Sequence, residues 1–291
     1  MSPRFDTITF LSDYGTGDEF VGVVHSVIRS IAPHVTVIDL THEIPAYDVR
    51  AGSLTLGRSA QYLCPGVVLA VVDPGVGSER RGIAVEVGDG QSYLVGPDNG
   101  LLASAVAMSG GATAAVALDN PAFQLPAPGP TFAGRDVFAP AAAHLCNGVP
   151  LDELGSAVDP LSLLPGIVPL PRDDEGTLVA QVIWVDRFGN CQLNIDPDEV
   201  DHLGPRIQLR WGDDVRTAER SVTYQGIAPG QVGLVVDSYG MLSVCLGKRS
   251  AADELRMPVG TEVALLQPGA DDTAPAAPTT QSVTLTPRSS S

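Results

Sequence analysis

The sequence predicts an α/β fold in which a mostly parallel sheet, sandwiched by helices, is followed by a smaller antiparallel, barrel-like β domain. Up to about residue 118, short apolar runs rich in β-branched residues alternate with helical patterns, which is typical of a parallel sheet covered by helices. After residue 176, short apolar runs follow one another with turns between them and little helical pattern, which is typical of an antiparallel sheet.

Each element of the first region follows from its own pattern. Apolar runs predict strands at residues 8–11, 35–40, 67–72, 83–87, 93–95 and 114–118. Apolar residues at helical spacing predict helices at 21–31, 49–60 and 137–146. Prolines gather between residues 120 and 130, and they exclude a helix or an inner strand there.

A proline-rich segment divides the chain. We expect an N-terminal α/β domain over residues 1–165, a linker over 166–176 and a C-terminal β domain over 177–268. Residues 269–291 lack aromatic residues and are rich in Pro, Ala, Ser and Thr, so we expect a disordered tail. The β domain should contain strands at 179–185, 191–195, 207–211, 233–236, 242–246 and 262–266.

Composition and charge exclude several classes of protein. The chain carries 34 Asp+Glu against 17 Lys+Arg, a formal net charge of −17, which excludes nucleic-acid binding through bulk basic charge. The N-terminus lacks the pattern of a secretory signal, and the charge-free stretch 101–118 contains a Ser-Gly-Gly turn, so we expect no membrane span and a cytoplasmic protein. The four cysteines are expected to be reduced and buried: Cys64, Cys146, Cys191 and Cys245.

Acidic residues follow two predicted strands, where open α/β sheets bind ligands. Asp13 and Asp73 each precede glycines that allow a ligand to approach the backbone closely, although an isolated Asp of this kind usually only stabilises a turn. Arg80, or Arg135 with its neighbour Asp136, could hold such a carboxylate ionised, and a surface ion pair is an equally good interpretation.

Two turns of the second domain also carry polar groups after strands, and composition favours plain turns: residues 186–190 and 237–240. The five histidines show no metal-ligand spacing with another His, Cys or carboxylate, so we expect no metal site. The chain contains no Walker loop, no dinucleotide-binding fingerprint and no nucleophile elbow.

Taken together, these loops resemble one family, the adenosine-forming S-adenosyl-L-methionine (SAM) hydrolases or SAM hydroxide adenosyltransferases, relatives of the fluorinase and chlorinase. The matching segments run in the family's order between about residues 7 and 266. They are residues 10–15, 38–42, 71–77 with Arg80, 96–101, 131–136, 188–190 and 237–240. Each segment alone is a weak signal, whereas the series is highly specific.

The resemblance implies roles for individual residues. Asp13 matches the carboxylate that binds both ribose hydroxyls, and Tyr47 matches an aromatic position beside the ribose. Phe188 and Asn190 match residues that stack on the adenine and hydrogen-bond it, and the backbone near Leu246 matches a strand that reaches its edge. The groups that match those addressing the methionine amine and carboxylate are Asp186 and Ser238, with Asp18 a further candidate.

The resemblance also implies a reaction and an assembly. Water or hydroxide would attack the ribose 5′ carbon in line with the departing sulfonium, giving adenosine and L-methionine with no cofactor, and Asp73 and Arg80 match two of three residues around that water. The third is usually His, and this chain has Ala133 in its place. Family members form trimers with sites between subunits, so we expect a homotrimer.

Three alternatives remain open at this point. A SAM-dependent halogenase is disfavoured by Asp73, because halogenases carry Tyr there and a carboxylate repels a halide. Ala133 favours a protein that binds SAM or adenosine without turnover. The plainest alternative is an α/β protein whose acidic loops are only structural.

Overall fold

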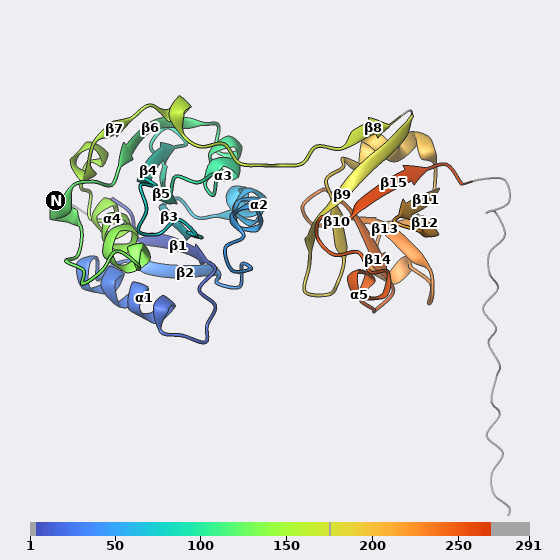
Figure 1. Ribbon diagram of the computed structural model, residues 1–291, viewed down its shortest axis with the longest axis horizontal. Helices are drawn as coiled ribbons and strands as arrows, with labels where there is room; N and C mark the ends of the chain where they lie inside the picture. The colour runs from blue at the N-terminus through green and yellow to red at the C-terminus, as the bar shows by residue number, and fades with distance from the viewer. Residues whose placement is uncertain (1–3, 175, 269–291) are drawn as a thin grey trace, which may run out of the picture. The chain divides into compact units, whose positions relative to one another are not determined.

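The computed structural model describes residues 4–174 and 176–268. The chain divides into two compact units, Met1–Val168 and Pro169–Ser291, and the two are described separately below (Figure 1). The boundary lies inside the segment that the sequence analysis takes as a linker. The expected disordered tail, residues 269–291, lies outside the described residues.

The first unit is built on a sheet whose parallel half was predicted. Strands β2, β1, β3 and β5 are neighbours in that order and run parallel, and β4, β6 and β7 extend the sheet by antiparallel pairing. The change of direction arises because β4 and β5 form a hairpin. The strands are β1 (Thr7–Ser12), β2 (Thr36–Thr41), β3 (Val67–Val71), β4 (Gly82–Val87), β5 (Ser92–Pro97), β6 (Ala112–Ala117) and β7 (Ala157–Val158).

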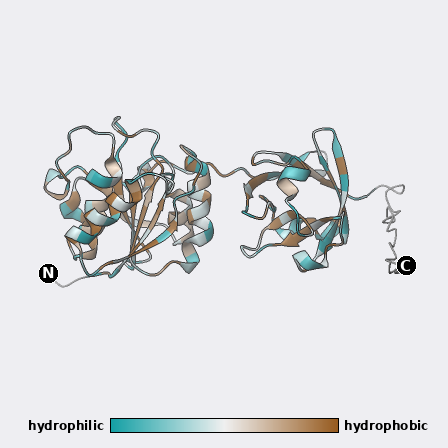
Figure 2. Cartoon of the chain, turned by 90° about the horizontal axis from the view of Figure 1, so that it is seen from below, coloured by the Kyte–Doolittle hydropathy of each residue, from teal (hydrophilic) through white to brown (hydrophobic). Residues whose placement is uncertain are grey.

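Helices cover both faces of this sheet, as predicted (Figure 1). Helices α1 (Phe20–Ile31) and α4 (Ala139–Cys146) pack on one face, and α2 (Val49–Ser59) and α3 (Ala103–Met108) pack on the other. Side chains alternate along each strand, so Phe10 belongs to the core under α1 and α4 while Leu11 belongs to the opposite core. Figure 2 shows the apolar residues gathered on the strands between the helices.

The helix predicted at 137–146 begins earlier, as a π-helical turn over Gly134–Phe138 that continues into α4. This turn brings the backbone at Gly134 against the Tyr14 hydroxyl, and a Cβ atom at position 134 would overlap that oxygen. The Tyr14 side chain has little room to move away, because the rings of Phe10, Phe20 and Phe132 surround its own with centroids 5.5–6.4 Å away. Position 134 therefore requires glycine as long as Tyr14 is present.

The second unit is a closed barrel. Strands β9, β10, β14, β13, β12, β11 and β15 pair in that order, and β15 pairs again with β9, while β8 extends the sheet beyond β9. The strands are β8 (Arg172–Asp174), β9 (Thr177–Val185), β10 (Cys191–Leu193), β11 (Arg206–Trp211), β12 (Asp214–Ser221), β13 (Val232–Val236), β14 (Leu242–Leu246) and β15 (Glu262–Leu266). A short helix, α5 (Ala251–Glu254), packs on β14.

Three details differ from the sequence analysis. Strand β12 was not predicted, because charged side chains interrupt it and leave no apolar run, and it pairs with β13 in parallel rather than antiparallel fashion. Strand β8 lies inside the segment taken as a linker. Cys64 is exposed, because it lies in the loop before β3 rather than in a strand, whereas Cys146, Cys191 and Cys245 are buried. Within the described ranges, no helix is long and apolar enough to cross a membrane.

The contact between Gly134 and Tyr14 yields a test by double-mutant cycle. Gly134→Ala should destabilise the protein by about 1–3 kcal/mol, since a methyl group is forced into a filled space. Adding Tyr14→Phe removes the overlapping oxygen and should recover much of this loss, which urea denaturation of the four proteins will measure. Gly22→Ala is the control, because nothing lies within 4 Å of a Cβ at that exposed position. Strictly additive losses would contradict the packing described.

Candidate active site

Two carboxylate residues, Asp13 and Asp73, follow neighbouring strands of the first sheet. Strands β1 and β3 are parallel neighbours in which Ser12 lies opposite Val71. The N–H of Asp13 then donates to the Val71 carbonyl over 3.3 Å, which ties the start of one loop to the end of the next strand. Asp73 follows two residues after Val71, so both acids lie at the carboxyl edge of the sheet, as predicted.

A cavity of about 300 Å³ opens at this edge. Four residues named in the sequence analysis line it: Asp13, Tyr47, Asp73 and Ala133. The remaining wall is mainly apolar and aromatic, and it consists of Tyr14, Phe20, Ala46, Val71, Val76, Thr131, Phe132 and Gly134. A mainly apolar pocket with a few convergent polar groups has the usual composition of a small-molecule site.

Asp73 and Arg80 form the bidentate pair that the sequence analysis considered. Arg80 Nε donates to Asp73 Oδ1 over 3.0 Å, and Arg80 Nη2 donates to Asp73 Oδ2. Only 5% of the Asp73 side chain and 13% of the Arg80 side chain are exposed. Burial raises the pKa of the Asp73 carboxyl above its ordinary value, while the charge and hydrogen bonds of Arg80 act in the opposite direction. The carboxylate is therefore held in one orientation and is more basic than an exposed Asp.

The turn after β3 makes this pairing possible. The Val76 N–H donates to the Asp73 carbonyl over 3.2 Å, and the Ser78 N–H donates to the Gly75 carbonyl over 3.1 Å, so the chain folds back on itself. The guanidinium of Arg80 also lies 5.4 Å from the centre of the buried Phe138 ring. A cation over an aromatic face is favourable, so Arg80 is held from two sides.

Asp13 organises the neighbouring wall. Its Oδ2 accepts a hydrogen bond of 2.9 Å from the backbone N–H of Tyr47. Tyr47 has a positive φ of 68°, which is uncommon for a residue with a side chain, and the residue is 74% exposed. Asp48, the next residue, caps helix α2 by accepting from the Ala51 N–H. Asp18 is exposed in the segment between β1 and α1, and it is not among the residues that line the cavity.

Tyr14 is a residue of the cavity to which the sequence analysis assigns no role. Burial and the nearby charges of Asp13 and Asp73 raise the pKa of its hydroxyl far above the ordinary value, so the phenol stays protonated. It follows Asp13 directly, and this adjacency is the signal that could have identified it.

Residues 131–134, which follow the proline-rich loop, line the cavity without adding a charged side chain to it. Ala133 places only a methyl group in the cavity wall, and Gly134 follows it. Arg135 pairs with its neighbour Asp136 through bonds of 2.6 and 2.9 Å, so it is not the partner of Asp73 that the sequence analysis considered. The carboxylate of Asp136 is the nearest one along the chain, and the Arg135 guanidinium pairs with it instead of with Asp73.

In the second unit, the turn after β9 is closed by Asp186. Its Oδ1 accepts from the backbone N–H groups of Phe188 and Asn190, and its Oδ2 accepts from the Asn190 side-chain amide over 2.7 Å. In this arrangement Phe188 is 76% exposed on the surface of the barrel, while Asn190 is buried. Asp186 thus acts as a turn carboxylate, and Phe188 is the group available to stack on a flat ligand.

Leu246 and Ser238 lie at opposite ends of β14. Cys191 lies opposite Val244, so the turn at 186–190 is beside the end of β14 where the buried Leu246 is found. Ser238 is exposed in the turn before β14. Asp237 closes this turn by accepting from Tyr239, Met241, Gln192 and Ser243.

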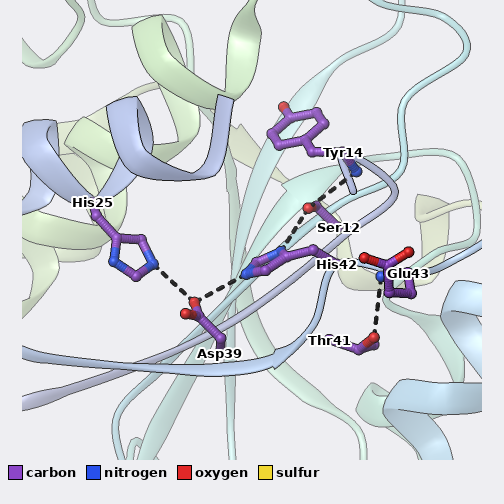
Figure 3. Close-up of polar contacts among 7 residues, drawn as sticks. All are labelled: Ser12, Tyr14, His25, Asp39, Thr41, His42 and Glu43. Carbon is purple, nitrogen blue, oxygen red and sulfur yellow. Dashed lines mark hydrogen bonds and ion pairs between the residues drawn. The ribbon is translucent and has the colours of Figure 1, made fainter. Parts of the chain in front are cut away.

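Next to Ser12, a polar cluster joins α1 to the end of β2 (Figure 3). His25 and His42 both direct Nε2 to the same oxygen of Asp39, and His42 Nδ1 lies 2.8 Å from Ser12 Oγ. Together, His25, Asp39 and His42 could hold a metal ion. No sequence spacing marked this group, because His25 belongs to α1 whereas Asp39 and His42 lie in and directly after β2. The expectation of no metal stays a prediction.

Comparisons with known proteins support one family in both units of the chain. Residues 8–155 match the SAM hydroxide adenosyltransferase N-terminal domain, and residues 180–264 match the C-terminal domain. A (R)-S-adenosyl-L-methionine hydrolase from Salinispora tropica is 43% identical over 87% of this chain and 95% of its own length. One from Thermus thermophilus is 37% identical over 89% and 99%, and a fluorinase from an Actinoplanes species is 27% identical over 88% and 96%.

Solved structures agree with these sequence matches. An uncharacterized conserved protein from Thermotoga maritima superposes with a TM-score of 0.82 at 32% identity, covering 89% of this chain and 99% of its own. A conserved hypothetical protein from Thermus thermophilus gives a TM-score of 0.70 at 34% identity, covering 91% and 100%. The two acidic loops, the barrel and both domain matches lead to one conclusion: the chain belongs to the SAM hydroxide adenosyltransferase family.

Proposed function

We propose that this protein hydrolyses (R)-S-adenosyl-L-methionine to adenosine and L-methionine. The proposal is supported by relatives at 37–43% identity that carry this activity in their names and that the chain matches over nearly their whole length. In the structure, the observation that carries it is the cavity in which Asp13 lies beside the buried Asp73–Arg80 pair.

Asp73 is proposed to position the attacking water. Arg80 fixes both carboxylate oxygens, and burial makes the carboxylate a better proton acceptor. The water oxygen forms a bond to the ribose 5′ carbon while the bond from that carbon to sulfur breaks, and its electron pair stays on the sulfur of methionine. The water loses one proton, first to Asp73 and then to solvent. Holding the water in line can supply roughly 7–11 kcal/mol in favourable cases.

The remaining assignments concern binding. Asp13 is proposed to accept hydrogen bonds from the two ribose hydroxyls, with Tyr47 beside the sugar. Phe188, Asn190 and the backbone at Leu246 are proposed to bind adenine. Asp186, Ser238 and Asp18 remain the candidates for the methionine end. We further propose that the protein is a cytoplasmic homotrimer that completes each site between subunits and needs no cofactor for the reaction.

The product assay separates the two enzymatic alternatives from simple binding. Purified protein is incubated with SAM, with and without chloride, and nucleosides are separated by chromatography. Adenosine and methionine in both samples support the proposal. A 5′-chloroadenosine product would assign the chain to the halogenases, which the fluorinase relatives make worth testing. Bound nucleoside without turnover would support the binding protein.

Asp73→Asn should lower kcat by roughly 10²- to 10⁴-fold, because the amide cannot accept the proton from water. The dissociation constant for adenosine should hardly change. In the unaltered protein, activity should fall as the pH drops through the pKa of Asp73, which lies above the ordinary value of 3.8, and the variant should lose this acid limb. Steady-state rates over a pH series measure both effects.

The control for this variant is Asp89→Asn, which removes the same charge in the exposed turn between β4 and β5. It should leave the rate and the pH profile unchanged. Full activity in a correctly folded Asp73→Asn protein would remove Asp73 from the mechanism.

Asp13→Ala should weaken adenosine binding by roughly 10- to 100-fold, since hydrogen bonds to a charged group contribute about 1.5–3 kcal/mol. Calorimetric titration with adenosine and 2′-deoxyadenosine gives the specific signature. The unaltered protein should prefer adenosine, and the variant should bind the two nucleosides almost equally. If the variant keeps the preference for the 2′-hydroxyl, another group binds the ribose.

Ala133→His should raise kcat, because an imidazole in the cavity wall can accept a proton that a methyl group cannot. Ala133→Leu, which adds bulk without a base, should not. A rate unchanged or lowered in the His variant would show that Asp73 and Arg80 suffice in this chain.

A further inference from the structure

The cluster of His25, Asp39 and His42 brings three ligand atoms together from two elements (Figure 3). His25 comes from α1, Asp39 from β2, and His42 from the residue after Thr41 at the end of that strand. His25 Nε2 lies 2.8 Å and His42 Nε2 lies 3.0 Å from Asp39 Oδ1. All three ligand atoms lie within 4.8 Å of one another.

Hydrogen bonding alone does not satisfy this cluster. His42 is buried, with only 5% of its side chain exposed, and the Phe10 ring lies 4.6 Å from its own. Its Nε2 is close to Asp39 Oδ1 but makes no hydrogen bond of acceptable geometry with any described residue. A buried nitrogen without a well-formed hydrogen bond is costly, and both α1 and β2 bring a metal-ligating atom close to this one.

The other ring nitrogen fits a metal-binding histidine. His42 Nδ1 lies 2.8 Å from Ser12 Oγ, which also accepts from the Tyr14 N–H over 3.3 Å. Histidines that bind metals almost always donate their second ring N–H to an oxygen, which fixes the tautomer and the ring orientation. If Nδ1–H donates to Ser12, Nε2 presents its lone pair toward Asp39 and His25.

We propose that His25, Asp39 and His42 bind a borderline divalent transition-metal ion such as Zn²⁺. Two imidazoles and one carboxylate match the ligands of zinc, whereas Ca²⁺ and Mg²⁺ prefer oxygen atoms alone. His25 and Asp39 are 34% and 42% exposed, so a fourth position can be filled from solvent.

The site would brace the loop that carries Asp13. His42 reaches this loop twice, through its ring at Ser12 and through its backbone carbonyl, which accepts from the Gly15 N–H over 2.8 Å. A metal ion on His42 would therefore stiffen residues 12–15 without taking part in the reaction at Asp73. This inference does not rest on the proposed function.

The test is zinc binding to the full chain after EDTA treatment and dialysis. Calorimetric titration with ZnCl₂ should show one saturable site per chain, and CoCl₂ should give the visible absorption of a four-coordinate ion. Ser12→Ala should weaken zinc by roughly 10- to 100-fold, the usual effect of losing the group behind a ligand. His25→Ala and Asp39→Asn should weaken it further. Circular dichroism checks that each variant is folded.

His202→Ala is the matched control, because this exposed histidine belongs to the second unit and not to the cluster. It should bind zinc like the unaltered protein. Zinc should also raise the melting temperature of the unaltered protein and of His202→Ala but not that of His25→Ala. The proposal would be overturned if the unaltered protein showed no saturable zinc binding. It would also be overturned if the His25 and Asp39 variants bound zinc as tightly as the unaltered protein.

Discussion

The parallel register of β1 and β3 is the constraint on which the candidate site depends. With Ser12 opposite Val71, the chain must deliver Asp13 and Asp73 to the same edge of the sheet. Two carboxylates near each other in a partly apolar pocket repel one another, and neither can be moved without changing the strand pairing. Two neighbouring groups are affected by this arrangement: Arg80 neutralises Asp73, while burial and the charges of both acids raise the pKa of the Tyr14 hydroxyl and keep it protonated.

Two opposing effects on the pKa of Asp73 determine the properties of the Asp73–Arg80 pair. Desolvation favours the neutral acid and Arg80 favours the anion, and the first effect is the larger one. The result is an oriented carboxylate with raised basicity, which an exposed ion pair does not provide. Removing only one partner would leave a buried charge unmatched, so the two residues should be treated as one unit.

Much of the fold could be predicted because the central strands of the first sheet, β1, β3 and β5, are buried on both faces and form nearly continuous apolar runs. Strand β12 escaped prediction for the opposite reason, since Asp214, Arg216 and Glu219 belong to a strand with a mostly exposed face. Among the candidate site residues, Asp13 and Asp73 could be identified because they follow predicted strands, and Arg80 because it lies a few residues after Asp73. The contact between Gly134 and Tyr14 and the meeting of His25 with Asp39 depend on how helices pack on the sheet, which no local pattern contains.

In the proposed reaction, the negative charges of the cavity favour binding of the substrate, but they do not by themselves favour its reaction. A sulfonium cation is attracted to an acidic pocket, but its positive charge disperses as the carbon–sulfur bond breaks. The carboxylates therefore stabilise the bound substrate at least as well as the transition state, and such binding does not by itself raise kcat. Acceleration must come from the position of the water relative to the 5′ carbon. The rigid Asp73–Arg80 pair, which would hold this water, is therefore more important for the rate than the net charge of the site.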